Sequence, residues 1–161
     1  MYTIRQVTMD DLEAVTALEA RCFPPEEAAT RDSFLYRIQT FPESFYVAEE
    51  NNRIIGLING CCSSKEAICD ELYSPDGGHE PCGQNQMIFG LATSPEKRHQ
   101  GIGSTLMRSF IEKARRMGKQ KMVLTCKEEK IHYYEKFGYV NHGVSQSVHG
   151  GSVWYDMVLD L

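Results

Sequence analysis

The chain has 161 residues, of which 42% are hydrophobic and 24% charged, and its formal net charge is −5. These values are typical of a single soluble globular domain, here residues 1–161, that can bury a core. The acidic balance argues against a nucleic-acid partner, and no apolar run approaches the roughly 20 residues of a membrane span. The first residues lack the apolar stretch of a signal peptide, which predicts a cytoplasmic protein.

Six cysteines are spread along the chain, and none of them forms a C-x-x-C pair or matches a spaced pair of histidines. This spacing gives no zinc site, and we expect no metal. We interpret the cysteines as reduced thiols, some of them buried as small hydrophobic residues. The alternative is that one of them, Cys126, is a nucleophile that accepts an acyl group.

The chain begins with a predicted strand over residues 2–7 and a helix that ends near Cys22. Acidic residues at positions 10 and 11 favour a helix start, and apolar residues then recur at helical spacing. The segment Phe23-Pro24-Pro25 ends the helix, because a residue before proline is disfavoured in the α region. This segment either lines a pocket or only connects two helices.

A second helix and a β-hairpin follow. Thr30 can cap the helix, which ends before Pro42. Residues 45–49 and 54–60 are apolar strands on either side of Glu50-Asn51-Asn52-Arg53. Asparagine tolerates positive φ, so this short connection predicts a hairpin turn.

Ser63–Gln84 is the least regular stretch, with several glycines and prolines and an excess of acidic residues. A loop of this length in a compact domain is usually functional or loosely ordered. Its negative charge can attract an amine, or it can simply be a solvated surface.

The central stretch predicts a strand, a glycine turn and a helix in succession. Met87–Thr93 is an apolar run that ends at Ser94-Pro95, and a basic turn follows over residues 97–103. From Ile102 the apolar residues recur at helical spacing as far as Ala114. Backbone N–H groups at such a helix start have no intrahelical partner, so they can bind a phosphate or pyrophosphate.

The last third predicts strands over 122–126, from Tyr139, and over 153–159, with a short helix over 131–137 and a turn at 148–151. The whole order is β-α-α-β-β-β-α-β-α-β-β. It indicates a mixed α/β domain in which a parallel β-α-β unit carries the glycine turn.

The glycine turn fits neither a Walker loop, since no Gly-Lys-Ser/Thr follows, nor a dinucleotide fingerprint, since Leu106 stands where a third glycine is needed. It reads Arg98-x-x-Gly101-x-Gly103, and Tyr134-x-x-x-Gly138-Tyr139 follows downstream. With both motifs the chain resembles GNAT-superfamily acetyltransferases from Ile4 to Leu159, and most of all the arylalkylamine (serotonin) N-acetyltransferase group. The resemblance implies the acyl-CoA N-acyltransferase fold, with about seven strands and four helices. The alternative interpretation, which does not use the resemblance, is that the two glycines only form a tight turn between a strand and a helix.

The resemblance implies that acetyl-CoA is the acetyl donor. Backbone groups of one strand would bind the pantetheine arm where two strands diverge, and the glycine turn would hold the pyrophosphate, with added positive charge from Arg98. The expected donor-binding residues are Leu91, Ala92, Thr93, Arg98, His99, Gln100, Gly101, Ile102, Gly103 and Ser104.

The resemblance also implies a general acid, Tyr134, which would protonate the leaving thiolate of CoA. An ordinary phenol has a pKa near 10, close to that of a thiol, so it can deliver this proton. The family's histidine pair on the central strand is replaced by Met87 and Phe89, which cannot accept a proton. Candidate bases are His79, Glu80, Glu128 and His149, and the alternative is that the amine loses its proton to water.

The expected acceptor is a primary amine of a small molecule, resembling an arylalkylamine or a polyamine, which attacks acetyl-CoA directly. Its pocket is predicted from Phe23, Pro24, Met87, Phe89, Leu91 and Thr125. Two alternatives remain at this stage: a protein or peptide amine as acceptor, or a non-catalytic module that senses acyl-CoA. The protein is expected to act as a monomer or homodimer.

Overall fold

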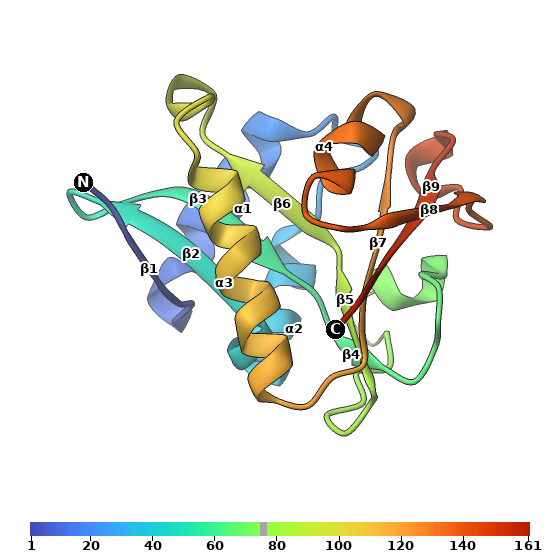
Figure 1. Ribbon diagram of the computed structural model, residues 1–161. Helices are drawn as coiled ribbons and strands as arrows, with labels where there is room; N and C mark the ends of the chain where they lie inside the picture. The colour runs from blue at the N-terminus through green and yellow to red at the C-terminus, as the bar shows by residue number, and fades with distance from the viewer. Residues whose placement is uncertain (75–76) are drawn as a thin grey trace.

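The computed structural model describes residues 1–74 and 77–161, which form two sheets joined into one layer flanked by helices (Figure 1). The first sheet is antiparallel, in the order β1-β2-β3-β6. Its strands are β1 (Thr3–Gln6), β2 (Phe45–Glu50), β3 (Arg53–Asn59) and β6 (Gly90–Thr93). The predicted hairpin joins β2 to β3, where Asn51 and Asn52 have φ of 51° and 63°.

The second sheet has the order β4-β5-β7-β9-β8, and only its β5–β7 pair is parallel. Its strands are β4 (Cys62–Ser63), β5 (Asn85–Ile88), β7 (Lys121–Cys126), β8 (Val140–Val144) and β9 (Tyr155–Asp160). The last strand begins two residues later than predicted, because residues 149–151 form a 3-10 turn and the next three are irregular.

The strand predicted over Met87–Thr93 is two strands that belong to different sheets. β5 pairs with β7 as far as Ile88, whereas β6 pairs with β3 from Gly90 onward. Phe89 lies at the crossing, and its N–H donates to the carbonyl of Asn59 at 2.7 Å. This division and the short β4 raise the strand count from the expected seven to nine in the described residues, while the predicted mixed α/β fold is confirmed.

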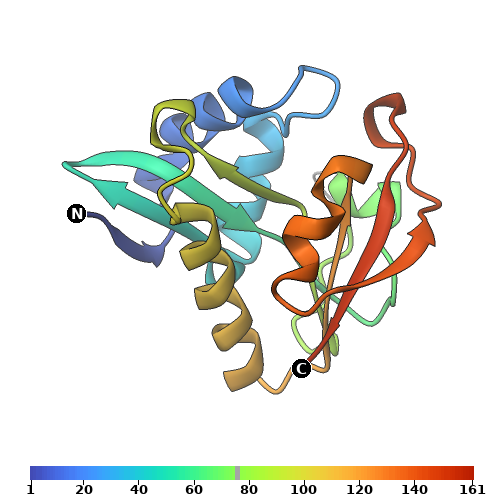
Figure 2. The same cartoon turned by 45° about the horizontal axis from the view of Figure 1, so that its top comes forward.

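Helices cover both faces of the first sheet. α1 (Leu12–Cys22) and α2 (Arg31–Thr40) lie on one face and α3 (Ile102–Arg116) on the other (Figure 2). The short α4 (Ile131–Glu135) packs against β8 and β9. The apolar stripe of α3 is fully buried, as its spacing predicted. None of the helices in the described ranges is long and apolar enough to cross a membrane.

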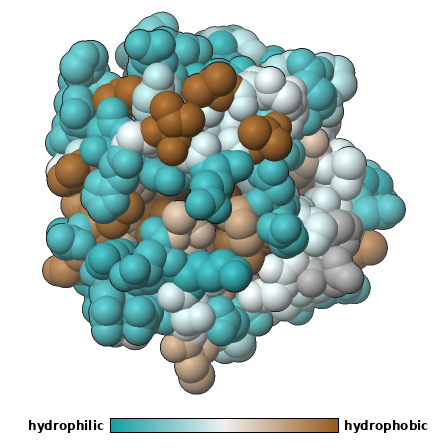
Figure 3. All heavy atoms as spheres, turned by 90° about the vertical axis from the view of Figure 1, so that its right-hand side faces the viewer, coloured by the Kyte–Doolittle hydropathy of each residue, from teal (hydrophilic) through white to brown (hydrophobic). Residues whose placement is uncertain are grey.

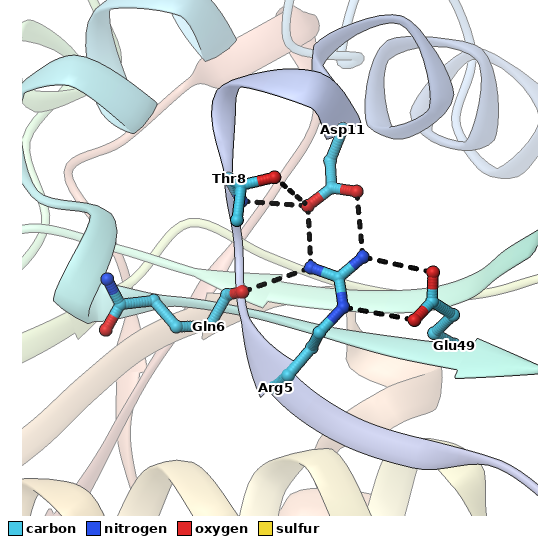
Figure 4. A network of polar contacts seen from close by, with 5 residues as sticks. All are labelled: Arg5, Gln6, Thr8, Asp11 and Glu49. Atoms are coloured by element: carbon cyan, nitrogen blue, oxygen red, sulfur yellow. Dashed lines mark hydrogen bonds and ion pairs between the residues drawn. The ribbon is translucent and has the colours of Figure 1, made fainter. Parts of the chain in front are cut away.

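Arg5 ties β1, β2 and the start of α1 together (Figure 4). Its guanidinium donates to both carboxylate oxygens of Asp11 at 2.8 and 2.9 Å and to both oxygens of Glu49 at 3.2 Å. Asp11 also accepts from the backbone N–H of Thr8 at 2.8 Å. One arginine therefore anchors the N-terminal strand to its neighbour and to the first helix.

The edge strand β8 and the loop after it expose four valines: Val140, Val144, Val148 and Val153. Figure 3 views the molecule from this side and shows apolar residues interspersed with hydrophilic ones. Scattered exposed apolar residues are common on protein surfaces.

Candidate active site

A cavity of about 410 Å³ lies where β6 and β7 diverge. One wall is the crossing segment from Ile88 to Leu91, and the opposite wall is Leu124–Cys126 at the end of β7. The strands part because β5 stops pairing with β7 at Leu124 and β6 is the edge strand of its own sheet. Helices α1 and α2 close one end of the cavity, and Tyr134 of α4 lies at the other.

The turn between β6 and α3 presents free backbone N–H groups. The first helical hydrogen bond runs from Thr105 to the carbonyl of Gly101 at 3.0 Å, so the N–H groups of residues 102–104 have no intrahelical acceptor. Gly101 is the N-cap with φ of 80°, a left-handed conformation that disfavours a side chain, and His99 has φ of 63°. The first helical turn carries no acidic residue. An anion fits here.

Glycine at position 103 keeps a narrow crevice open. A Cβ there would lie 3.0 Å from the Tyr133 hydroxyl and 3.5 Å from that of Thr93, and Leu91 is 4.0 Å away. A second cavity of about 420 Å³ adjoins this crevice between α3 and α4. Its lining includes the cationic residues Arg108, Arg115 and Lys136. These features fit a ligand with a thin chain, a diphosphate and a further anionic end, as CoA has.

Most of the predicted donor-binding residues lie along this path. Leu91 lines the main cavity, Ser104 lines the second one, and Arg98, His99 and Gln100 are exposed on the turn. Two of the predicted side chains face the core instead: Ala92 packs with α1 and Ile102 with the cluster around α3. They can offer a ligand only their backbone.

Tyr134 lines the main cavity from α4. Its ring makes edge contacts with Tyr133 and Tyr139, at centroid distances of 5.1 and 5.9 Å. Within the described ranges its hydroxyl has no hydrogen-bond partner. Burial raises the pKa of Tyr134 above its usual value, so the phenol keeps its proton at neutral pH. It can donate a hydrogen bond or a proton to a group bound in the cavity.

Cys126 lies on the opposite wall as a neutral thiol. Burial, together with the nearby Glu129 carboxylate, raises the pKa of its thiol to about 11. Because the thiolate is the nucleophilic form, this environment opposes an acyl-enzyme on Cys126. All six cysteines are free, and no group of three metal-ligating side chains occurs in the described residues.

Five of the six side chains predicted for the acceptor pocket lie around one cavity. Phe23, Pro24, Phe89, Leu91 and Thr125 all line the cavity. Met87 lies elsewhere: it is completely buried in a core cluster with Phe41 and Val123 and does not line the cavity. The reason is strand alternation, since Met87 and Ile88 point to opposite faces of β5 and only Ile88 reaches the opening.

Two charged side chains in the cavity wall, Glu19 and Arg37, were not predicted as site residues. Both are only 5% exposed. Arg37 donates to Asn59 Oδ1 at 2.9 Å, and its guanidinium lies 4.7 Å from the centre of the Phe89 ring. The sequence does contain a sign of Glu19, because this residue is four positions after Val15 and seven after Leu12, which places it on the buried stripe of α1. A carboxylate there contradicts the pattern.

Of the predicted base candidates, only His149 reaches the cavity. Glu80 instead accepts hydrogen bonds from Ser63 and Ser64, and Glu128 is exposed. His79 accepts from the backbone N–H of Cys62 at 3.1 Å, outside the cavity lining. The ring of His149 stacks on Tyr73, and its Nε2 lies 2.9 Å from a backbone carbonyl at residue 27.

An ion pair and hydrogen bonds between distant segments cover the end of the cavity next to α1 and α2. Glu27, in the loop between α1 and α2, accepts from Lys127 at 2.8 Å and from Ser152 at 3.2 Å. Its backbone carbonyl contacts His149, and Gly150 lies so close that a Cβ there would be 2.7 Å from the Glu27 side chain. The α1–α2 loop is thus fastened to the segment before β9.

Comparisons with known proteins agree with this geometry. Residues 12–139 match the model of the acetyltransferase (GNAT) family. An uncharacterized N-acetyltransferase, YkwB, of Bacillus subtilis is 33% identical over 121 residues, which are 68% of this chain and 54% of the relative. This chain therefore spans about half the length of that relative.

More distant proteins share the fold. The serotonin N-acetyltransferase of Mesocricetus auratus is 27% identical over 148 residues, covering 76% of this chain and 68% of the relative. This likeness is distant and does not single out the serotonin group, so the closer assignment expected from the motifs stays a prediction. The GphF GNAT-like decarboxylase, solved with isobutyryl-CoA, superposes with a TM-score of 0.82 at 24% identity and 98% coverage of both chains.

Proposed function

This chain belongs to the GNAT family of acetyltransferases, and on that premise we propose that it transfers the acetyl group of acetyl-CoA to the primary amine of a small molecule. The proposal rests on three neighbouring features of the structure. A cavity between diverging strands adjoins a helix start with free N–H groups and the ring of Tyr134, whose hydroxyl has no partner in the part of the chain that the structure describes.

The chain's own groups account for donor binding. The N–H groups of residues 102–104 bind the pyrophosphate, aided by the positive end of the α3 dipole and by Arg98. Arg108 and Lys136 give the second cavity the positive charge that the 3′-phosphate of CoA needs. Unpaired backbone groups along the free edge of β6 hold the pantetheine amides and orient the thioester toward the main cavity.

Tyr134 supplies the proton for the leaving sulfur. The amine nitrogen forms a bond to the acetyl carbon, the carbon–sulfur bond breaks, and the sulfur receives the phenolic proton of Tyr134. Burial raises the pKa of Tyr134, so the phenol holds this proton near neutral pH until negative charge develops on the sulfur. Transfer is direct, because the protonated Cys126 is no nucleophile.

A small acceptor suits the covered end of the cavity. A peptide acceptor needs an open groove that leads its chain away from the amine, whereas the hydrogen bonds of Glu27 to Lys127 and Ser152 cover that end. The lining of Phe23, Phe89 and Leu91 favours an apolar body next to the amine. A peptide acceptor and a sensor without turnover are the alternatives.

Release of CoA from acetyl-CoA should be measured with arylalkylamines, polyamines and short peptides, for the parent, Tyr134→Phe and the control Tyr155→Phe on β9. We expect turnover with a small amine. The rate constant kcat of Tyr134→Phe should fall at least tenfold, while Tyr155→Phe stays at the parent's rate. Calorimetric binding of acetyl-CoA with no turnover for any acceptor would favour the sensor, and turnover with peptides alone would favour the peptide acceptor.

A further inference from the structure

Glu19 is a buried carboxylate with one oxygen left over. Its Oε2 accepts from the backbone N–H of Ala29 at 3.0 Å, which fixes the side chain in the cavity wall. Its Oε1 is buried and has no hydrogen-bond partner among residues 1–74 and 77–161. An unsatisfied buried oxygen of this kind destabilises a fold, and a carboxylate does so more strongly than a neutral group.

The free oxygen lies near the place where the strands part. Oε1 is 3.7 Å from the position that a Cβ on Gly90 would take, and Gly90 lines the cavity beside Phe89. The amide nitrogen of Asn59, also buried and unpartnered, is 3.7 Å from the same point. Glu19 therefore presents a negative acceptor at the edge of β6, on the α1 and α2 side of the sheet.

An ammonium group is the ligand that this oxygen fits. It brings a positive charge and N–H donors, which are what an isolated carboxylate lacks. Arg37 cannot fill the role, because its guanidinium is held by Asn59 and Phe89, and in the described part of the chain neither residue belongs to an ion pair.

We propose that Glu19 binds the ammonium group of the acceptor and is the general base that takes its proton at Oε1. This inference rests on the acetyl transfer proposed above. Glu19 would thus serve as the base in place of the histidine pair, whose positions are occupied by Met87 and Phe89.

The protons balance. Glu19 takes one proton of the ammonium group, which frees the lone pair that forms the nitrogen–carbon bond. As the carbon–sulfur bond breaks, Tyr134 gives its proton to sulfur, and the nitrogen loses a second proton, which restores the phenol. The third stays in the amide, and Glu19 releases its proton to water. One proton is released in each turnover.

Burial raises the pKa of Glu19, against the lowering effects of the Ala29 N–H and the Arg37 charge. A base with a pKa closer to the working pH is the more effective one. The ionisable side chains next to Glu19 are Arg37 of α2 and Cys22 of α1. The parts of β3 and β6 that pack near Glu19 carry no titratable side chain. Across the cavity stand Tyr73, Glu129, Lys130, Tyr134, His149 and the Glu27–Lys127 pair. Of these, His149 is the rival base that the test includes.

The test compares Glu19→Gln with the parent, using 2-phenylethylamine and 2,2,2-trifluoroethylamine as acceptors. Glutamine keeps the acceptor for the Ala29 N–H but cannot take a proton. Glu13→Gln on the exposed face of α1 is the matched control, because Glu13 forms a surface ion pair with Arg31 and does not line the cavity. His149→Gln tests the rival group.

We expect kcat/KM for 2-phenylethylamine to fall about 100-fold or more in Glu19→Gln. Trifluoroethylamine is largely neutral at pH 7.5 and needs no base for its first deprotonation, so its kcat/KM should fall much less. The acidic limb of the parent's profile should vanish in Glu19→Gln and persist in His149→Gln and Glu13→Gln. The melting temperature of Glu19→Gln at pH 8 should equal or exceed the parent's, since a buried charge is removed.

Equal losses for the two amines, or loss of the acidic limb in His149→Gln alone, would overturn the assignment of Glu19 while leaving acetyl transfer intact. A parent that acetylates neither these amines nor any other small amine defeats the proposed function itself. A Glu19→Gln protein that melts well below the parent would mean that the carboxylate is structural.

Discussion

Replacing Gly101 by alanine separates the strain of the glycine turn from its role in donor binding. Gly101 has φ of 80°, and no atom lies within 4 Å of the position that a Cβ would take. The substitution therefore meets no clash in the free protein. It costs only the left-handed backbone strain of a residue with a Cβ, about 1–2 kcal/mol. For a chain of this length that lowers the melting temperature by about 2–8 °C.

The same helix supplies the matched control. Gly118, just past the end of α3, has φ of 73° and equally open space around its Cβ position. Gly118→Ala should thus lose the same stability, but it lies at the far end of a 15-residue helix from the phosphate site.

Titration calorimetry with acetyl-CoA distinguishes the two variants. The added methyl group of Gly101→Ala faces the space where the pyrophosphate is proposed to lie, so we expect at least a tenfold weaker Kd, or about 1.4 kcal/mol. Gly118→Ala should bind as the parent does. Parental affinity in Gly101→Ala would refute the phosphate site, and equal weakening in both variants would show a global effect of strain.

Two further predictions concern stability and the unused nucleophile. Burial opposes ionisation of Asp11, but the hydrogen bonds from Arg5 and Thr8 outweigh burial and lower the pKa of this carboxyl. The stabilisation that Asp11 gives the fold is therefore fully present above the unfolded pKa of about 3.9. It is lost as the pH falls through the folded pKa. Asp11→Asn should cost about 1–3 kcal/mol in urea unfolding at pH 7 and less at pH 3, and a difference independent of pH would contradict this. Cys126→Ser should keep turnover within about threefold, and mass spectrometry of the parent with acetyl-CoA should find no acetylated protein, because the pKa of about 11 keeps the thiol protonated. An adduct that the serine variant lacks would restore the covalent route.

The strand, glycine turn and helix in which we expect the donor to bind were predictable from the sequence because their determinants are local. Arg98, Gly101 and Gly103 lie within six consecutive residues, and Gly101 provides the left-handed backbone at which the turn enters the helix. The parallel β-α-β unit around it follows from the same stretch, and β5 and β7 are indeed parallel. Short-range pattern and turn chemistry were sufficient there.

The acceptor side depends on contacts between distant segments, which no local pattern encodes. The division of one predicted strand at Phe89 arises because β3 and β7 compete for the two halves of the segment. Met87 and Phe89 pack in the same core cluster, but Phe89 also lines the cavity whereas Met87 is completely buried. The packing of α1 and α2 brings Glu19 and Arg37 to the segment where the strands separate. In the sequence, the only sign of their role is that both are charged residues at buried positions of their helices.

The divergence of β6 from β7 also links the stability of the protein to its metabolic setting. A donor whose amides pair with the free edge of β6 completes a row of hydrogen bonds that the chain alone leaves open. Binding then adds RT ln(1 + [L]/Kd) to the free energy of unfolding, about 2.7 kcal/mol at a hundredfold excess over Kd. The resistance of this protein to heat and proteolysis should consequently follow the acetyl-CoA concentration of its surroundings.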